Sequence, residues 1–131
     1  MRHAMSRFHT ILVVDDDPAQ AQEIAETLTA ARYAVRTAST GDDALAELLS
    51  DPPSLAIIDC PLPGRSGLSV MRLALGAGRC TPFVVITGQP DLPDGAAGLS
   101  NAVRFLRKPL DLRALLGVVD SLIRQAGNSA A

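Results

Sequence analysis

The sequence predicts one α/β domain, built as a five-stranded parallel sheet with helices on both faces. Five short apolar runs alternate with segments in which apolar residues recur at helical spacing, a pattern typical of βαβ units. The length of 131 residues suits a single domain with a substantial core. Hydrophobic residues make up 47% of the chain but aromatic residues only 3%, so we expect an aliphatic core.

The expected strands are apolar runs rich in β-branched residues. They cover residues 10–14, 33–38, 54–58, 83–86 and 103–107. The run at 33–38 alternates apolar with polar residues, so we expect it nearer an edge of the sheet. Four of the runs end directly before polar side chains, namely Asp15 with Asp16, Asp59, Thr87 and Lys108.

The expected helices begin after residues that commonly cap helix N-termini. These caps are Asp17, Thr40, Ser66 and Asp111, and the helices end near residues 31, 50, 75 and 126. Apolar spacing assigns Ala44, Leu45, Leu48 and Leu49 to the buried face of the second helix, and Leu68, Met71 and Leu75 to that of the third. Residues 89–98 hold two Pro and two Gly, so we expect a short, irregular or mobile helix there.

We expect residues 1–9 to form a flexible tail, residues 10–126 the domain, and residues 127–131 a frayed C-terminal tail. No apolar run approaches the ~18 residues of a membrane span and no leader pattern is present, so a cytoplasmic location is expected. The net charge of -2 gives no electrostatic footprint for nucleic acid. Cys60 and Cys80 show neither a disulfide framework nor zinc-site spacing.

The polar residues at the strand ends are the candidate functional residues. Because the carboxyl ends of parallel strands meet at one edge of a sheet, we expect Asp15, Asp16, Asp59, Thr87 and Lys108 to converge. Alone, each has a structural explanation, such as a cap, a satisfied turn hydroxyl or a solvated lysine. Their convergence favours a functional site.

Phosphoryl transfer is the chemistry that this set of side chains fits. Neighbouring carboxylates repel each other unless a cation or base lies between them, and Mg2+ prefers oxygen ligands. A carboxylate can also act as a nucleophile and form an aspartyl phosphate. The reaction then needs mainly positioning and charge neutralisation, which Mg2+ and a lysine supply. Lys108 is the only lysine in the sequence, and its compact ammonium suits a phosphoryl oxygen.

Four motifs in register resemble the signature of response-regulator receiver domains. They are Val13-Val14-Asp15-Asp16, Asp59-x-Pro61-x-Pro63-x-x-x-Gly67, Thr87-Gly88 and Lys108-Pro109. The resemblance spans residues 10–125 and implies a flavodoxin-like (βα)5 fold. It also implies a signalling phosphoacceptor of a two-component system or phosphorelay, with no enzymatic activity beyond its own phosphorylation and dephosphorylation.

The resemblance implies a role for each site residue. Asp59 would accept the phosphoryl group from a sensor-kinase phosphohistidine. Asp59, Asp16 and the backbone carbonyl of Pro61 would bind Mg2+ or Mn2+ directly, and Asp15 would bind it through water. Lys108 would pair with the phosphoryl group.

The resemblance further implies a conformational switch and two residues that adjust the lifetime of the aspartyl phosphate. Thr87 would swing toward the phosphoryl group, and Phe105 would rotate inward with it. Pro61 and Gln89 occupy the positions that tune aspartyl-phosphate lifetime in this family. Because Pro61 has no side-chain donor, we expect an unusual dephosphorylation rate.

The partners implied are a sensor histidine kinase or phosphotransfer protein, and an unidentified protein that receives the signal. We expect this chain alone to bind neither nucleic acid nor membrane, and to be a monomer or weak homodimer. No output segment follows the last helix, so we expect a stand-alone receiver or a fragment of a longer regulator or hybrid kinase.

Other functions remain as alternatives at this point. Asp15-x-Asp17, Thr87 and Lys108 resemble motifs of haloacid-dehalogenase-type phosphatases, with Asp15 as the nucleophile. That family needs a later acidic pair, which is missing after Lys108, and it leaves Asp59 without a role. A receiver used only as a non-phosphorylated scaffold is disfavoured by the complete acidic set. A nucleotide-binding Rossmann unit lacks its Gly-rich loop.

Overall fold

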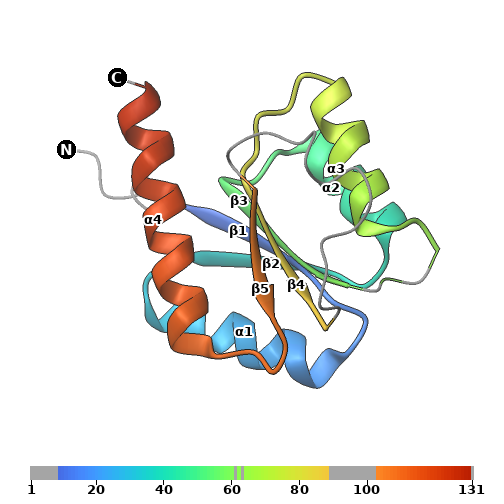
Figure 1. Ribbon diagram of the computed structural model, residues 1–131. Coiled ribbons are helices and arrows are strands. Elements are labelled where there is room, and N and C mark those ends of the chain that lie inside the picture. The colour runs from blue at the N-terminus through green and yellow to red at the C-terminus, as the bar shows by residue number, and fades with distance from the viewer. Residues whose placement is uncertain (1–8, 61, 63, 89–102, 131) are drawn as a thin grey trace.

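The computed structural model describes residues 9–60, 62, 64–88 and 103–130, with side chains to residue 125. Five parallel strands form one sheet in the order β2-β1-β3-β4-β5, which confirms the predicted fold class (Figure 1). The strands are β1 (Thr10–Val14), β2 (Ala34–Ala38), β3 (Leu55–Cys60), β4 (Phe83–Thr87) and β5 (Val103–Arg107). The order places β3, which carries Asp59, at the centre of the sheet.

Helices cover both faces of the sheet. Within the described ranges these are α1 (Pro18–Ala30), α2 (Gly41–Ser50), α3 (Gly67–Gly76) and α4 (Leu112–Ala130). Figure 1 shows α1 and α4 on one face, and α2 and α3 on the other. The short or irregular helix expected after β4 lies outside the described residues. No helix in the described part of the chain has the length and apolarity needed to cross a bilayer.

The core consists of two layers, one on each face of the sheet. In β1, Ile11 and Val13 pack with α1 and α4, whereas Leu12 and Val14 pack with α2 and α3. All four side chains are fully buried. Successive side chains of a strand point to opposite faces, so a strand buried on both faces reads as a continuous apolar run. This is the pattern from which the central strands were predictable.

The helix caps form where the sequence predicts them. Asp17 Oδ1 accepts from the backbone N–H groups of Ala19 (3.0 Å) and Gln20 (3.5 Å) at the start of α1. The side chains of Thr40, Ser66 and Asp111 accept equivalent bonds at α2, α3 and α4. Each helix therefore starts at a fixed residue directly after a strand or loop.

Two helices bury most, but not all, of the residues predicted to face the sheet. In α2, Leu48 is fully buried, but its neighbour Leu49 is 36% exposed. In α3, Val70 and Ala74 are buried, whereas Leu75 is only half-buried. Successive residues of a helix lie about 100° apart around its axis, so adjacent apolar residues cannot both point at the sheet. Apolar spacing alone left that choice open.

Two element boundaries also differ from the expectation. β2 begins at Ala34, and Tyr33 lies directly before it, where its hydroxyl donates a hydrogen bond to Asp120 of α4. α4 continues to Ala130, so the backbone of residues 127–130, expected to be frayed, is helical. Residues 1–8 of the expected N-terminal tail lie outside the described residues.

Candidate functional site

The strand register brings the carboxyl ends of β1, β3, β4 and β5 to one edge of the sheet. Val14 pairs with Ile58, so Asp15 follows β1 at the level of Asp59. Cys60 of β3 pairs with Thr87, the last residue of β4. The backbone N–H of Lys108 donates to the Thr87 carbonyl (2.9 Å), which fixes Lys108 just beyond β5.

Three carboxylates gather at this edge. One ligand oxygen from each of Asp15, Asp16 and Asp59 lies within 4.8 Å of the other two. Asp15 is 3% exposed and Asp59 is 5% exposed, whereas Asp16 is open to solvent. The structure thus brings together the three acids that the sequence placed at strand ends.

Lys108 faces the same group. Its Nζ lies 2.9 Å from Asp59 Oδ1 and donates a hydrogen bond to the Cys60 carbonyl (3.2 Å). Asp59 Oδ1 is buried and accepts no hydrogen bond from the described residues, so its contact with Lys108 is an ion pair. The side chain of Lys108 is 34% exposed, so the ammonium is reachable from solvent.

Gln20, in the first turn of α1, is a site residue that sequence reasoning missed. Its Nε2 donates to Asp15 Oδ2 (2.6 Å) and to Asp59 Oδ2 (3.1 Å). The other oxygen of Asp15 accepts from the backbone N–H of Asp17 (2.9 Å). Asp15 is therefore held in one orientation by two donors, and Gln20 links it to Asp59.

The environment of Asp59 disfavours its charged form. Burial raises the pKa of the Asp59 carboxyl; the nearby Lys108 ammonium lowers it, and the charge of Asp15 raises it, with a net upward shift. Burial and the charge of Asp59 also raise the pKa of the Cys60 thiol. The raised pKa favours the neutral thiol of Cys60.

The three carboxylates fit a hard divalent cation. Mg2+ and Mn2+ take oxygen ligands, and Mg2+ is commonly held by one or two carboxylates together with water and phosphate oxygens. Asp59 supplies a buried carboxylate and Asp16 an accessible one, and their oxygens lie close together with one of Asp15. Pro61, whose carbonyl the sequence also suggests as a ligand, lies outside the described residues.

The two expected switch residues lie on neighbouring strands. Thr87 is 5% exposed at the end of β4. Phe105 in β5 is partly buried and packs against the core layer beneath α2 and α3. A Cβ built on Gly88 would lie 3.7 Å from Lys108 Cδ, so the turn after Thr87 runs beside the Lys108 side chain. Gln89, the second expected lifetime residue, lies outside the described residues.

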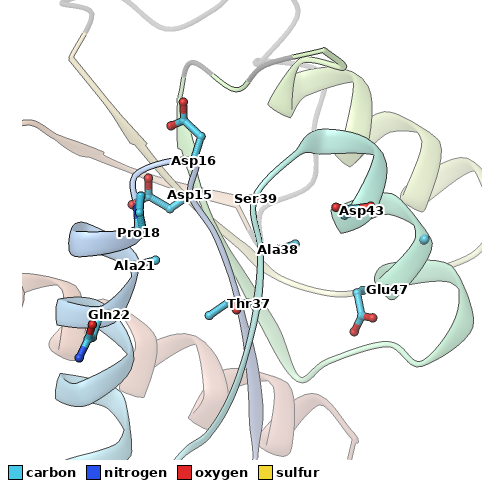
Figure 2. Close-up of a pocket in the computed structure, with 11 residues that line it drawn as sticks. Asp15, Asp16, Pro18, Ala21, Gln22, Thr37, Ala38, Ser39, Asp43 and Glu47 are labelled. Carbon is cyan, nitrogen blue, oxygen red and sulfur yellow. The ribbon is translucent and has the colours of Figure 1, made fainter.

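A cavity of about 650 Å³ lies beside the acidic cluster, between the start of α1 and α2 (Figure 2). Asp15 and Asp16 line one side of it, and Asp43 and Glu47 line the side formed by α2. Asp59 is not among its lining residues. The cavity therefore reaches the acidic cluster from the β2 side, next to the phosphoacceptor candidate but not over it.

The fold and this edge of the sheet define a receiver domain of two-component signalling. The family model of the response regulator receiver domain matches residues 11–120, and the chain belongs to this family. The phosphatase interpretation that began from Asp15 is not favoured by this match.

Similar proteins agree with this assignment. The response regulator MprA of Mycobacterium tuberculosis is 35% identical over 116 residues, which cover 88% of this chain and 50% of that protein. The chain thus spans about half the length of the curated relatives it matches. The CheY-like receiver domain protein of Methanospirillum hungatei is 26% identical, with a TM-score of 0.83 over 93% of this chain and 98% of that one. The receiver domain of the Francisella response regulator 1452 shares the fold, with a TM-score of 0.81 at 23% identity, over 90% of this chain and 98% of that one.

Proposed function

We propose that this chain accepts a phosphoryl group on Asp59 from a phosphohistidine, and that the modification switches a surface that binds another protein. The observation that carries the proposal is the surrounding of Asp59. Its carboxylate is buried at the end of the central strand, 2.9 Å from the Lys108 ammonium and clustered with Asp15 and Asp16. The family of the chain supports a sensor histidine kinase or a phosphotransfer protein as the donor.

The transfer is a single displacement at phosphorus. An oxygen of the Asp59 carboxylate forms a bond to phosphorus while the bond from phosphorus to the donor imidazole nitrogen breaks. The electron pair of that bond stays on the imidazole. Negative charge then accumulates on the phosphoryl oxygens, where the Lys108 ammonium stabilises it.

The cation would be Mg2+ or Mn2+, held by Asp16 and Asp59 directly and by Asp15 through water, with the carbonyl of Pro61 as a further ligand. When bound, it neutralises charge on the carboxylates and on the phosphoryl oxygens. The chain's own residues position the acceptor: in the cation-free protein, the ion pair with Lys108 and the hydrogen bond from Gln20 hold both oxygens of Asp59.

We also propose that Thr87 and Phe105 move as the switch. Thr87 ends the strand next to Asp59, and its hydroxyl would bind a phosphoryl oxygen once one arrives. The state with Thr87 and Phe105 drawn inward would then be favoured, as a shift of population. Pro61 and Gln89 would set the lifetime of the aspartyl phosphate.

The wider context follows from the same proposal. Residues 10–126 would form the receiver unit, located in the cytoplasm with its kinase. The protein that receives the signal would bind the switched surface. The curated relatives extend well beyond the matched region, so any output activity in a longer chain would belong to a separate part.

Incubation with acetyl phosphate and Mg2+ tests the proposal directly. We expect one acyl phosphate per chain, sensitive to hydroxylamine and mapped by mass spectrometry to the peptide that contains Asp59. Asp59→Asn should remove this label. Asp51→Asn should leave it, because Asp51 is an exposed carboxylate whose side chain is 83% accessible and pairs with Arg36 instead.

Three results would contradict the proposal. A label that persists in Asp59→Asn would place the nucleophile elsewhere, and a label on Asp15 would restore the phosphatase interpretation. A chain that takes no label although it is folded and binds Mg2+ would support the scaffold interpretation.

A further inference from the structure

The side-chain amide of Gln20 bridges two of the three carboxylates of the site. Its Nε2 lies 2.6 Å from Asp15 Oδ2 and 3.1 Å from Asp59 Oδ2. The bridge joins the end of β1 to the end of β3 from the first turn of α1. It therefore lies inside the cluster whose ligand oxygens approach within 4.8 Å of one another.

The chemistry of the partners fixes which end of the amide faces the cluster. Ionised carboxylates only accept hydrogen bonds, whereas the amide nitrogen carries two hydrogens and the amide oxygen none. A single NH2 group can therefore serve both acids at once, and the amide oxygen could serve neither.

The Gln20 amide reduces the repulsion between Asp15 and Asp59, as a cation would, but less strongly. Two carboxylates this close repel each other, and the partial positive charge of the two N–H groups offsets part of that repulsion. A divalent cation held by Asp59 directly and by Asp15 through water offsets more of it. The amide hydrogens and the cation are both positive, so they cannot both lie between Asp15 and Asp59.

We infer that Gln20 competes with the divalent cation: its amide holds Asp15 and Asp59 together in the cation-free protein and has to leave them when the cation binds. This inference rests on the proposed function, because it concerns the cation of that reaction. Gln20 is thus a positioning residue that sets how much cation is needed before Asp59 can react.

Replacement of Gln20 by Met isolates the effect. Methionine has a similar length and favours helix as well as glutamine does, but it cannot donate. The cation-free state then loses two hydrogen bonds, while the cation-bound state loses none. Because only the cation-free state is destabilised, the free energy of cation binding becomes more favourable. The gain equals the free energy by which the substitution destabilises the cation-free protein.

Binding of Mn2+ alone measures this change without any phosphoryl donor. The electron paramagnetic resonance signal of free Mn2+ gives its dissociation constant, and competition gives that of Mg2+. We expect both constants to fall about fivefold to a hundredfold in Gln20→Met, the net effect of two hydrogen bonds. Gln22→Met is the matched control, because Gln22 lies on the same helix and its amide donates to the exposed Glu26 (3.1 Å).

Thermal unfolding supplies a second readout. Without cation, Gln20→Met should unfold at a lower temperature than the wild type, and saturating Mg2+ should remove the difference. A residue with a purely structural role would leave the same difference at every Mg2+ concentration. Gln20→Leu serves as a second variant if the methionine variant does not fold.

Three outcomes would overturn the inference: unchanged Mn2+ affinity, weaker Mn2+ affinity, or a loss of stability that Mg2+ does not remove. Asp16→Asn tests the cation site separately. If Mn2+ binding survives that change, the proposed cation site is wrong. If Asp16→Asn abolishes binding but Gln20→Met leaves it unchanged, the site stands and the role of Gln20 is wrong.

Discussion

Gly41 packs directly against the backbone of Arg65, in the loop that follows β3. A methyl group on Gly41 would overlap the Arg65 carbonyl oxygen. Next to it, Arg65 Nε donates to Asp42 Oδ1 (2.8 Å). The loop that leads away from Asp59 is therefore held against the start of α2 at two adjacent points.

Gly41→Ala should destabilise the protein. The added methyl group must displace backbone at Arg65, and overpacking of this kind costs about 1–3 kcal/mol. The free energy of unfolding in urea measures it. Gly117→Ala is the control: Gly117 lies in α4 with open space around it, so alanine there should stabilise the helix by about 0.5–1 kcal/mol. If both substitutions stabilise, the contact between Gly41 and Arg65 does not constrain the fold.

Substitutions of the neighbouring acids Asp16 and Asp17 should have different effects, on cation binding and on stability respectively. Asp17→Ala removes the N-cap of α1 and should cost about 1 kcal/mol of stability, with Mn2+ affinity unchanged. Asp16→Ala should weaken Mn2+ binding at least about tenfold, with little loss of stability because Asp16 is exposed. Urea unfolding and Mn2+ titration on both variants check this. The reverse pattern would reassign the ligand to Asp17.

Asp59→Asn should raise the stability of the cation-free protein at neutral pH. Because the pKa of Asp59 is raised in the fold, its stabilising contribution is present below the unfolded pKa and is lost as pH rises through the folded pKa. The asparagine variant escapes that loss. Its advantage in unfolding temperature should therefore shrink as the pH falls toward about 4. An advantage that stays constant with pH would contradict the raised pKa of the buried Asp59 carboxyl. Asp51→Asn supplies the control at an exposed carboxylate.

Tyr33 should ionise at unusually high pH. Burial, the hydrogen bond to Asp120 and the charge of Asp120 raise its pKa, and the charge of Arg124 only partly opposes them. Tyr33 is the single tyrosine and the chain has no tryptophan, so ultraviolet absorbance follows its ionisation directly. Asp120→Asn should lower the pKa. Because the folded pKa is the higher one, stability should fall as pH rises above about 10. Ionisation at the ordinary pH of tyrosine would show that the bond does not persist in solution.

The strands and the converging acids were predictable because their signals are local. A strand buried on both faces reads as an apolar run, and a parallel sheet brings Asp15 and Asp59 to one edge without further information. The caps were predictable for the same reason: Asp17 contacts N–H groups only two and three residues away.

The features that sequence reasoning missed depend on where separate elements meet. Gln20 reaches Asp59 only because the first turn of α1 lies over the end of β3, and a glutamine in a helix carries no periodic or motif signal. Tyr33 lies just before β2, and its hydroxyl donates a hydrogen bond to Asp120 of α4. Leu49 is exposed because α2 presents Ala44 and Leu48 to the sheet, a rotation that apolar spacing leaves open.

Lys108 also allows the site to be labelled selectively by chemical modification. It is the only lysine in the sequence, and its ammonium is reachable from solvent beside Asp59. An amine-selective reagent therefore modifies this side chain and otherwise only the α-amino group. The rate of that reaction can be followed by the mass of the peptide that contains Lys108, even in an unfractionated mixture. It would report whether the Asp59 carboxylate is free or phosphorylated.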